Sequence, residues 1–171
     1  GGRRSILPVL LLLSLLALSP LAAPVRADAL TRDADGVYLI ATPADLREFR
    51  DGVNSEELTS ADARLTADID LSVNGTPEEW TPIGDGRNGT QSNVGEPNYC
   101  GAFDGAGHTV KGYRINKADE MGFFGTVGGG GTVRGLTVSG DINITDKGNP
   151  TYAGGVAANC LSGGTIEGCV N

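Results

Sequence analysis

A short pattern, Thr-Val or Thr-Ile followed by any residue and glycine, recurs along this chain. It appears as TVKGYRI at residues 109–115, as TVRGLTV at 132–138 and as TIEGCVN at 165–171. Between the last two copies the match extends without a gap, because residues 122–138 align with residues 155–171. Repeats spaced by about 20 to 50 residues are typical of proteins that stack similar units along one axis. The chain is therefore predicted to fold as a solenoid.

The repeats favour short β-strands over helices. Apolar and polar residues alternate within each copy, and glycines separate the segments. The segment GAFDGAGHTV at 101–110 puts a strand and a glycine turn ahead of the first copy, in the same places as the segment ahead of the second. Parallel stacking of such strands predicts an all-β fold of the parallel β-helix type, with coils of about 22 residues.

Glycine makes up 27 of the 171 residues, about twice its usual share. The repeat glycines Gly112, Gly135 and Gly168 are predicted to supply a positive φ or a close backbone approach within the coils. The segment from Asp104 through Gly105 and Gly107 to His108 is predicted to form a structural turn whose polar side chains hydrogen-bond the backbone between coils.

The coils are expected to begin at Leu65 and to fill residues 65–171 as an incomplete set of repeats. In LTADIDL at 65–71, alternate apolar side chains predict one strand, with Asp68 and Asp70 on its outer face. WTPIG at 80–84 is interpreted as a further short strand. The polar stretches 85–98 and 145–151 are interpreted as insertions between coil strands.

Residues 28–64 are predicted to cap the stack. GVYLIA at 36–41 is interpreted as a strand, and a helix then begins with Thr42 as N-cap, followed by Pro43 and Asp45 in the first turn. One face of this short amphipathic helix carries the apolar residues Leu46, Phe49 and Val53. Such a face suits a plug over the apolar end of a coil stack.

Residues 1–27 are typical of a secretory signal peptide. Two arginines precede an apolar helical run at 6–18, and the cleavage-like end predicts a cut between Ala27 and Asp28. A membrane anchor is the alternative interpretation of this segment. The export segment predicts a secreted or wall-associated protein. Because the chain begins with Gly1 and stops at Asn171 within a repeat, we expect it to be a fragment.

The charge balance disfavours nucleic-acid binding. Three of the 13 basic residues lie in the export segment, so 10 basic side chains remain against 21 acidic ones. No association with a membrane is expected once the export segment is removed.

The three cysteines are Cys100, Cys160 and Cys169. In the ungapped self-alignment Cys160 falls on Val127 and Cys169 on Leu136, which predicts that both thiols are buried. A disulfide between Cys160 and Cys169 is left open, with Cys100 unpaired. The cysteine spacing does not suit zinc.

Two groups of residues are candidates for catalysis. His108 stands near Asp104 in sequence, as a base beside a carboxylate would, and Asp68 and Asp70 are placed as the paired carboxylates of a glycosidase or a lyase would be. A structural turn and a solvated strand face explain the same residues. We therefore assign no catalytic residue, no cofactor and no metal site.

Several segments in order resemble a known family: YLIATPADLREFRDGVNS, LTADIDLS, WTPIG, GAFDGAGHTV, MGFFGTVGGGGTVRGLTVSG and AGGVAANCLSGGTIEGCVN. From about Gly36 to Asn171 the chain resembles bacterial surface proteins with GLUG-type repeats, related to the N-terminal region of secreted immunoglobulin A peptidases. The resemblance implies a right-handed β-helix on a large cell-surface or secreted protein, with further repeats or modules downstream. The chain departs from the family pattern at Ala158 and Cys160.

These observations favour a non-enzymatic β-helix module that serves as an adhesin, stalk or spacer. Its partner is an unidentified host or cell-surface ligand, either a glycan or a protein. One alternative is a β-helix polysaccharide lyase or glycoside hydrolase. Another alternative is the non-catalytic N-terminal region of a secreted metallopeptidase.

Overall fold

A computed structural model describes residues 30–85, 97–117, 121–144, 152–161 and 163–171. The predicted signal peptide and its cleavage point at Ala27 and Asp28 lie outside the described residues, as does most of the two predicted insertions. Among the described ranges, we find no helix with the length and apolar character that crossing a lipid bilayer requires.

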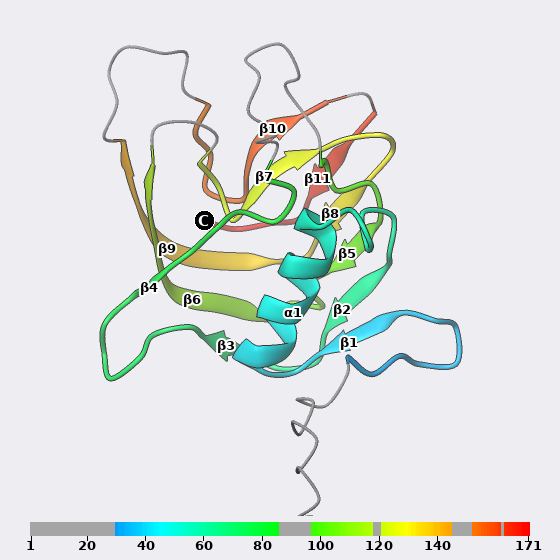
Figure 1. Cartoon of the computed structure of the whole chain (residues 1–171), viewed down its shortest axis with the longest axis horizontal. Helices are drawn as coiled ribbons and strands as arrows, with labels where there is room; N and C mark the ends of the chain where they lie inside the picture. Colours follow the sequence, from blue (N-terminus) through cyan, green and yellow to red (C-terminus); the bar gives the residue numbers. More distant parts are fainter. Residues whose placement is uncertain (1–29, 86–96, 118–120, 145–151, 162) are drawn as a thin grey trace, which may run out of the picture.

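Short strands joined by turns make up most of the described structure (Figure 1). In chain order the elements are β1 Tyr38–Ile40, α1 Pro43–Asn54, β2 Ala63–Leu65, β3 Ile69–Asp70, β4 Glu78–Glu79, β5 Ala102–Asp104, β6 Thr109–Lys117, β7 Phe124–Val127, β8 Thr132–Arg134, β9 Thr137–Ile144, β10 Ala157–Cys160 and β11 Thr165–Glu167.

Every pairing between these named strands is parallel. One sheet has the order β1-β2-β5-β8-β11, a second has the order β3-β6-β4 with β9 also on β6, and the third pairs β7 with β10. Consecutive strands such as β5, β6 and β7 belong to three different sheets, and the chain later returns to each sheet beside its earlier strand. The predicted all-β parallel architecture is confirmed.

The ungapped alignment of the last two repeats gives the observed strand register. Ile166 pairs with Val133 between β11 and β8, and Cys160 pairs with Val127 between β10 and β7. The same one-to-one spacing holds for both strand pairs because no residue is inserted between them. Sequence periodicity alone therefore predicts this part of the stack.

The repeat pattern predicted that the first copy, TVKGYRI, stacks on the second, TVRGLTV, and this prediction was wrong. TVKGYRI does not lie beside TVRGLTV; instead Thr109 in β6 pairs with Thr137 in β9. The strand that lies beside β8 is β5, where Phe103 pairs with Val133. Both alignments match Thr-Val and glycine, so the local motif did not distinguish them. The true offset is 28 residues (109 to 137), and other coils are longer, such as 33 residues (132 to 165), so the expected length near 22 was also wrong.

LTADIDL forms two strands in two sheets and not one strand. Leu65 ends β2, Ile69 begins β3, and a corner at residues 66–68 separates them. Leu65, Ile69 and Leu71 are all about 1% exposed. The corner contains three residues, so the inward-facing positions before and after it remain an even number of residues apart. The sequence therefore alternates as it would in one continuous strand.

WTPIG is mostly irregular. The regular strand β4 lies just before it, and within the segment Ile83 makes a single parallel bridge to Phe124. Trp80 and Ile83 are nevertheless buried, so the segment contributes side chains to the core.

The capping helix agrees with the prediction. Thr42 Oγ1 accepts a hydrogen bond from Asp45 N at 3.2 Å, and Asp45 Oδ2 accepts one from Thr42 N at 2.9 Å. This reciprocal pair is a capping box, which satisfies backbone donors that a helix start leaves free. Leu46, Phe49 and Val53 are fully buried on one face.

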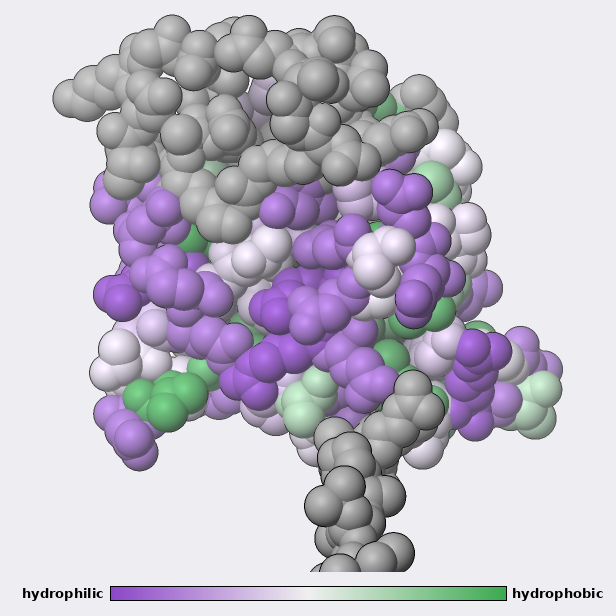
Figure 2. Space-filling model, in the orientation of Figure 1, coloured by the Kyte–Doolittle hydropathy of each residue, from purple (hydrophilic) through white to green (hydrophobic). Residues whose placement is uncertain are grey.

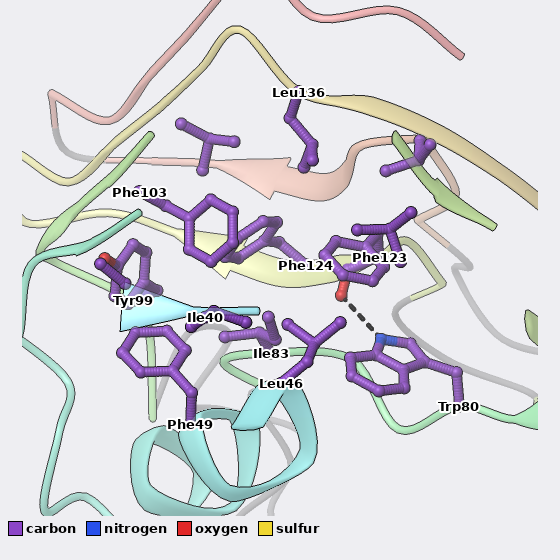
Figure 3. Packing of buried hydrophobic residues seen from close by; sticks show 14 of the residues in the cluster. Ile40, Leu46, Phe49, Trp80, Ile83, Tyr99, Phe103, Phe123, Phe124 and Leu136 are labelled. Carbon is purple, nitrogen blue, oxygen red and sulfur yellow. Dashed lines mark hydrogen bonds between the residues drawn. The ribbon is translucent and has the colours of Figure 1, made fainter. Parts of the chain in front are cut away.

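Aromatic side chains join the helix to the strands (Figure 3). The ring of Phe49 contacts Tyr99 and Phe103, with centroids 5.9 and 6.0 Å apart. Trp80 stacks flat on Phe123 at 5.1 Å, and its indole nitrogen donates to the Phe123 carbonyl at 3.0 Å. The core therefore continues from α1 through the coil strands as one cluster.

Candidate functional site

A column of alternating charges runs across the strands β2, β5, β8 and β11. Arg64, Asp104, Arg134 and Glu167 occupy matching register positions on consecutive strands. Asp33, just before β1, adds an acidic group beside Arg64. We call these five residues the charge column.

Distances within the charge column show direct pairing in its centre. Arg134 Nη2 donates to Asp104 Oδ2 at 2.9 Å, and Arg64 Nε lies 3.8 Å from the same oxygen. Arg64 also lies 3.8 Å from Asp33 Oδ2. Partial burial of Asp104 disfavours its charged form, but hydrogen bonds from Arg134 and from Ala106 N outweigh that effect and lower its pKa.

The turn from Asp104 to His108 is held by hydrogen bonds of the Asp104 side chain and of the backbone. Asp104 Oδ1 accepts from Ala106 N at 2.9 Å, and His108 N donates to the Gly105 carbonyl at 2.8 Å. Gly107 N donates to the carbonyl of Gly135 at 2.8 Å, which links this turn to the next coil.

The catalytic interpretation required His108 to pair with Asp104. The structure does not show this pair. His108 Nδ1 lies 3.1 Å from Asp68 Oδ1, a residue 40 positions earlier on the preceding coil. The same oxygen of Asp68 accepts from Thr109 N at 2.9 Å. This backbone hydrogen bond, together with the contact to His108, lowers the pKa of Asp68.

Asp70 makes a separate set of contacts. Its Oδ1 accepts from Ser72 Oγ at 2.6 Å and from Ser72 N at 2.9 Å, and Oδ2 lies 3.4 Å from Lys111 Nζ. The hydrogen bonds from Ser72 lower the pKa of Asp70, and the positive charge of Lys111 adds a smaller effect in the same direction. A glycosidase needs one carboxyl group whose pKa is raised so that it can donate a proton. Asp68 and Asp70 are both shifted in the opposite direction.

The three repeat glycines share a backbone conformation but not an environment. Gly112, Gly135 and Gly168 have φ values of 75°, 58° and 58°. A Cβ on Gly112 would lie 2.4 Å from Asp70 Oδ1, whereas no atom lies closer than 3.7 Å at Gly135 or 3.9 Å at Gly168. Gly112 marks an irregularity in β6 between Lys111 and Tyr113. It is therefore not the counterpart of Gly135.

A second polar network covers the sheet that contains β6. Arg114 Nε and Asn116 Nδ2 both donate to Glu79 Oε1, at 2.6 and 2.8 Å. Asn143 Nδ2 in turn donates to Asn116 Oδ1 at 3.2 Å. Figure 2 shows that the coloured part of the face in view is mostly hydrophilic.

A polar hollow of about 450 Å³ lies beside β1. Its walls come from the turn before β1 and the loop after α1, and they include Arg32, Asp35, Tyr38, Glu57 and Asp62. Arg32 stacks over the ring of Tyr38 at 4.2 Å. Sequence reasoning missed this hollow because the parallel pairing of β1 with β2 brings its two walls together.

The three cysteines are free thiols. Cys160 is exposed and Cys169 is only partly buried, so the prediction that both thiols are buried was wrong, and no Cys160–Cys169 disulfide is present. Among the described residues β10 has a paired strand on one side only, so Cys160 lacks the covering layer that buries Val127. Cys169 is partly buried against the core, and Cys100 is also only partly exposed.

Comparison with known proteins gives two relatives. A putative Gly-rich membrane protein of Evansella cellulosilytica is 33% identical over 126 residues, which cover 71% of this chain and 13% of that protein. Halomucin of Haloquadratum walsbyi is 29% identical over 140 residues, which cover 81% of this chain and 2% of halomucin. No family model matches the chain, and no solved structure matches it. The chain thus spans a small fraction of either relative.

Proposed function

We propose that this chain is a non-enzymatic repeat module, a right-handed parallel β-helix, that serves as an adhesin, stalk or spacer in a secreted or cell-wall-associated bacterial protein. The parallel return of the chain to each sheet carries this proposal. Strand β5 lies between β2 and β8, and β6 lies beside β3 and β9, as successive coils of one helix would. In such stacks each coil contacts only its neighbours, and many coils together give an extended surface.

The relatives support a place at the cell surface. One is named a membrane protein rich in glycine and the other halomucin, and each is far longer than this chain. A segment that repeats a simple stacking unit suits a spacer or stalk within a long protein. We propose GLUG-type repeats as the repeat class and residues 1–27 as the export signal.

The environment of the carboxylates supports a structural role for them. Asp68, Asp70 and Asp104 each have a lowered pKa, and each accepts a backbone hydrogen bond in or next to a turn. The bonds to Asp70 and Asp104 each come from the residue two positions later, within the local turn, whereas the bond from Thr109 to Asp68 joins neighbouring coils. Ionised carboxylates of this kind stabilise turns, and they are poor proton donors.

Incubation with glycans tests the absence of catalysis. The purified chain is mixed with acidic and neutral polysaccharides, with and without calcium, and the products are measured by chromatography. We expect intact polysaccharide in every mixture. Robust cleavage that is lost in Asp68→Asn would overturn the proposal in favour of a β-helix enzyme.

An experimental structure of the chain tests the helical path. The proposal requires that the coil from β5 through β6 and β7 to β8 winds in a right-handed sense. A left-handed winding, or sheets that do not close around one core, would contradict it.

A further inference from the structure

One end of the strand stack is covered and the other is open. Helix α1 buries Leu46, Phe49 and Val53 in the core, and the ring of Phe49 lies 6.1 Å from the ring of Tyr38 in β1. At the opposite end, β10 and β11 each have a paired strand on one side only among the described residues. Three of the four large apolar side chains that are exposed in the described structure lie there, namely Tyr152, Leu161 and Val170 at 45%, 37% and 57%. An edge with free backbone groups and apolar side chains is suited to pairing with another strand.

A buried polar group at this end lacks a partner. Asn159 in β10 is only 8% exposed, and its Nδ2 makes no hydrogen bond. It lies in register with Thr126 of β7 on the coil below. A buried donor without an acceptor costs free energy, so an acceptor supplied from above would stabilise the fold.

The charge column ends at this face on an acidic residue. Along the column the charges alternate in register from Arg64 to Asp104, Arg134 and Glu167. Glu167 has Arg134 on the coil below, and the next position in the column would adjoin Glu167 directly. Opposite charges at adjacent positions attract and like charges repel, so the column favours a basic residue there.

We propose that this open end binds one further β-coil by parallel strand addition. That coil places a side-chain acceptor over Asn159, an aliphatic residue over Ile166 and a basic residue over Glu167. The inference rests on the proposed stacking function and adds the chemistry of the partner strand. A second copy of the chain fits less well, because its own open end presents Glu167 and its other end is covered by α1.

The chain already contains one segment with the required pattern. Thr126, Val133 and Arg134 lie directly below Asn159, Ile166 and Glu167 in the observed register. The spacing between the acceptor and the basic residue is therefore the same on the two coils. A copy of this segment is the natural probe for the open end.

The test extends the full chain after Asn171 with residues 139–154 followed by residues 122–138. This order keeps the observed offset of 33 residues (132 to 165) and introduces no cysteine. The matched control carries the same extension with its copy of Arg134 replaced by glutamate. The rate of thiol alkylation at Cys160, mapped by mass spectrometry, reports whether the end is covered.

We expect alkylation of Cys160 to slow by at least about tenfold with the basic extension. The acidic extension should protect Cys160 about fivefold less, since the pair is solvent-exposed. Glu167→Gln should make the two extensions protect Cys160 equally, which would show that charge, and not misfolding of the acidic extension, explains the difference.

For the chain that keeps Glu167, three other outcomes overturn all or part of the inference. Equal protection by the two extensions would refute the charge rule while leaving coil stacking intact, and no protection by either would refute strand addition itself. Concentration-dependent dimers of the unextended chain with Cys160 protected would identify a second copy as the occupant. Cleavage of glycans would refute the proposed function alone and would leave these labelling results unchanged.

Discussion

Gly112 combines two constraints that a side chain cannot meet. Its φ is +75°, and a Cβ would lie 2.4 Å from Asp70 Oδ1 and 2.8 Å from Ser72 N. Gly107 has a similar φ of +81°, but no atom lies within 4 Å of its Cβ position. The two glycines therefore separate backbone strain from steric overlap.

Gly112→Ala is expected to lower the free energy of unfolding by at least about 2 kcal/mol, because strain of about 1 kcal/mol adds to a clash with backbone. Gly107→Ala, the control, should cost only about 1 kcal/mol. Urea denaturation of both variants measures the difference. Equal losses would show that the loop of Ser72 yields to the new methyl group.

The thiols differ in exposure and should differ in reactivity. Cys160 is exposed, whereas Cys100 and Cys169 are partly covered. We expect native alkylation to modify Cys160 first, because the reagent reaches an exposed sulfur more readily than a covered one. Peptide mapping after short exposure checks this order, and a Cys160 that reacts only after denaturation would contradict the open end.

At the scale of elements, α1 closes the core mainly through Phe49. The Phe49 ring touches aromatic rings of β1 and β5 and the ring of Tyr99, with centroids about 6 Å apart. Phe49→Ala is expected to lower the free energy of unfolding by about 3 to 5 kcal/mol, since it leaves a cavity among these rings.

Glu48 on the exposed side of the same helix provides the control for Phe49→Ala. Glu48→Ala should change stability by no more than about 0.5 kcal/mol. Chemical denaturation of the two variants measures both changes. A small loss for Phe49→Ala would mean that α1 is dispensable as a cover for the coil stack.

At the scale of the whole molecule, ionised aspartates hold coils and turns together. Asp68, Asp70 and Asp104 have pKa values below the ordinary value of 3.8. A lowered pKa means that the unfolded chain binds more protons than the folded one near that pH. Their contribution to stability is therefore complete above about pH 4 and is lost as the pH falls through the lowered values.

We expect the melting temperature to fall steeply as the pH drops below about 4. Above about pH 4 these three aspartates should contribute almost no pH dependence. Asp68→Asn should make the acid dependence shallower, because it removes one of the carboxylates. Glu48→Gln is the control and should keep the dependence of the parent chain. Calorimetry at several pH values tests this, and identical slopes for Asp68→Asn and the parent would refute the linkage.

Local and periodic features of the chain were predictable. The helix start, with Thr42 as N-cap and Asp45 in the first turn, depends on residues three apart, so sequence alone identifies it. The register of β11 on β8 follows from an ungapped repeat, because equal spacing places equal side chains side by side. Parallel all-β stacking was predictable for the same reason.

The partners of the earlier coils depended on contacts that only the tertiary structure establishes. Coils of unequal length separate β2, β5 and β8, so motif similarity could not show that β6 lies beside β9 or that His108 meets Asp68. The self-alignment correctly placed Cys160 above Val127, but burial requires a layer on both sides and not register alone. The sequence by itself determined the repeating unit and its cap. Only the tertiary structure decided which side chains of neighbouring coils touch, because insertions between strands change their spacing in sequence without changing the distance between stacked strands.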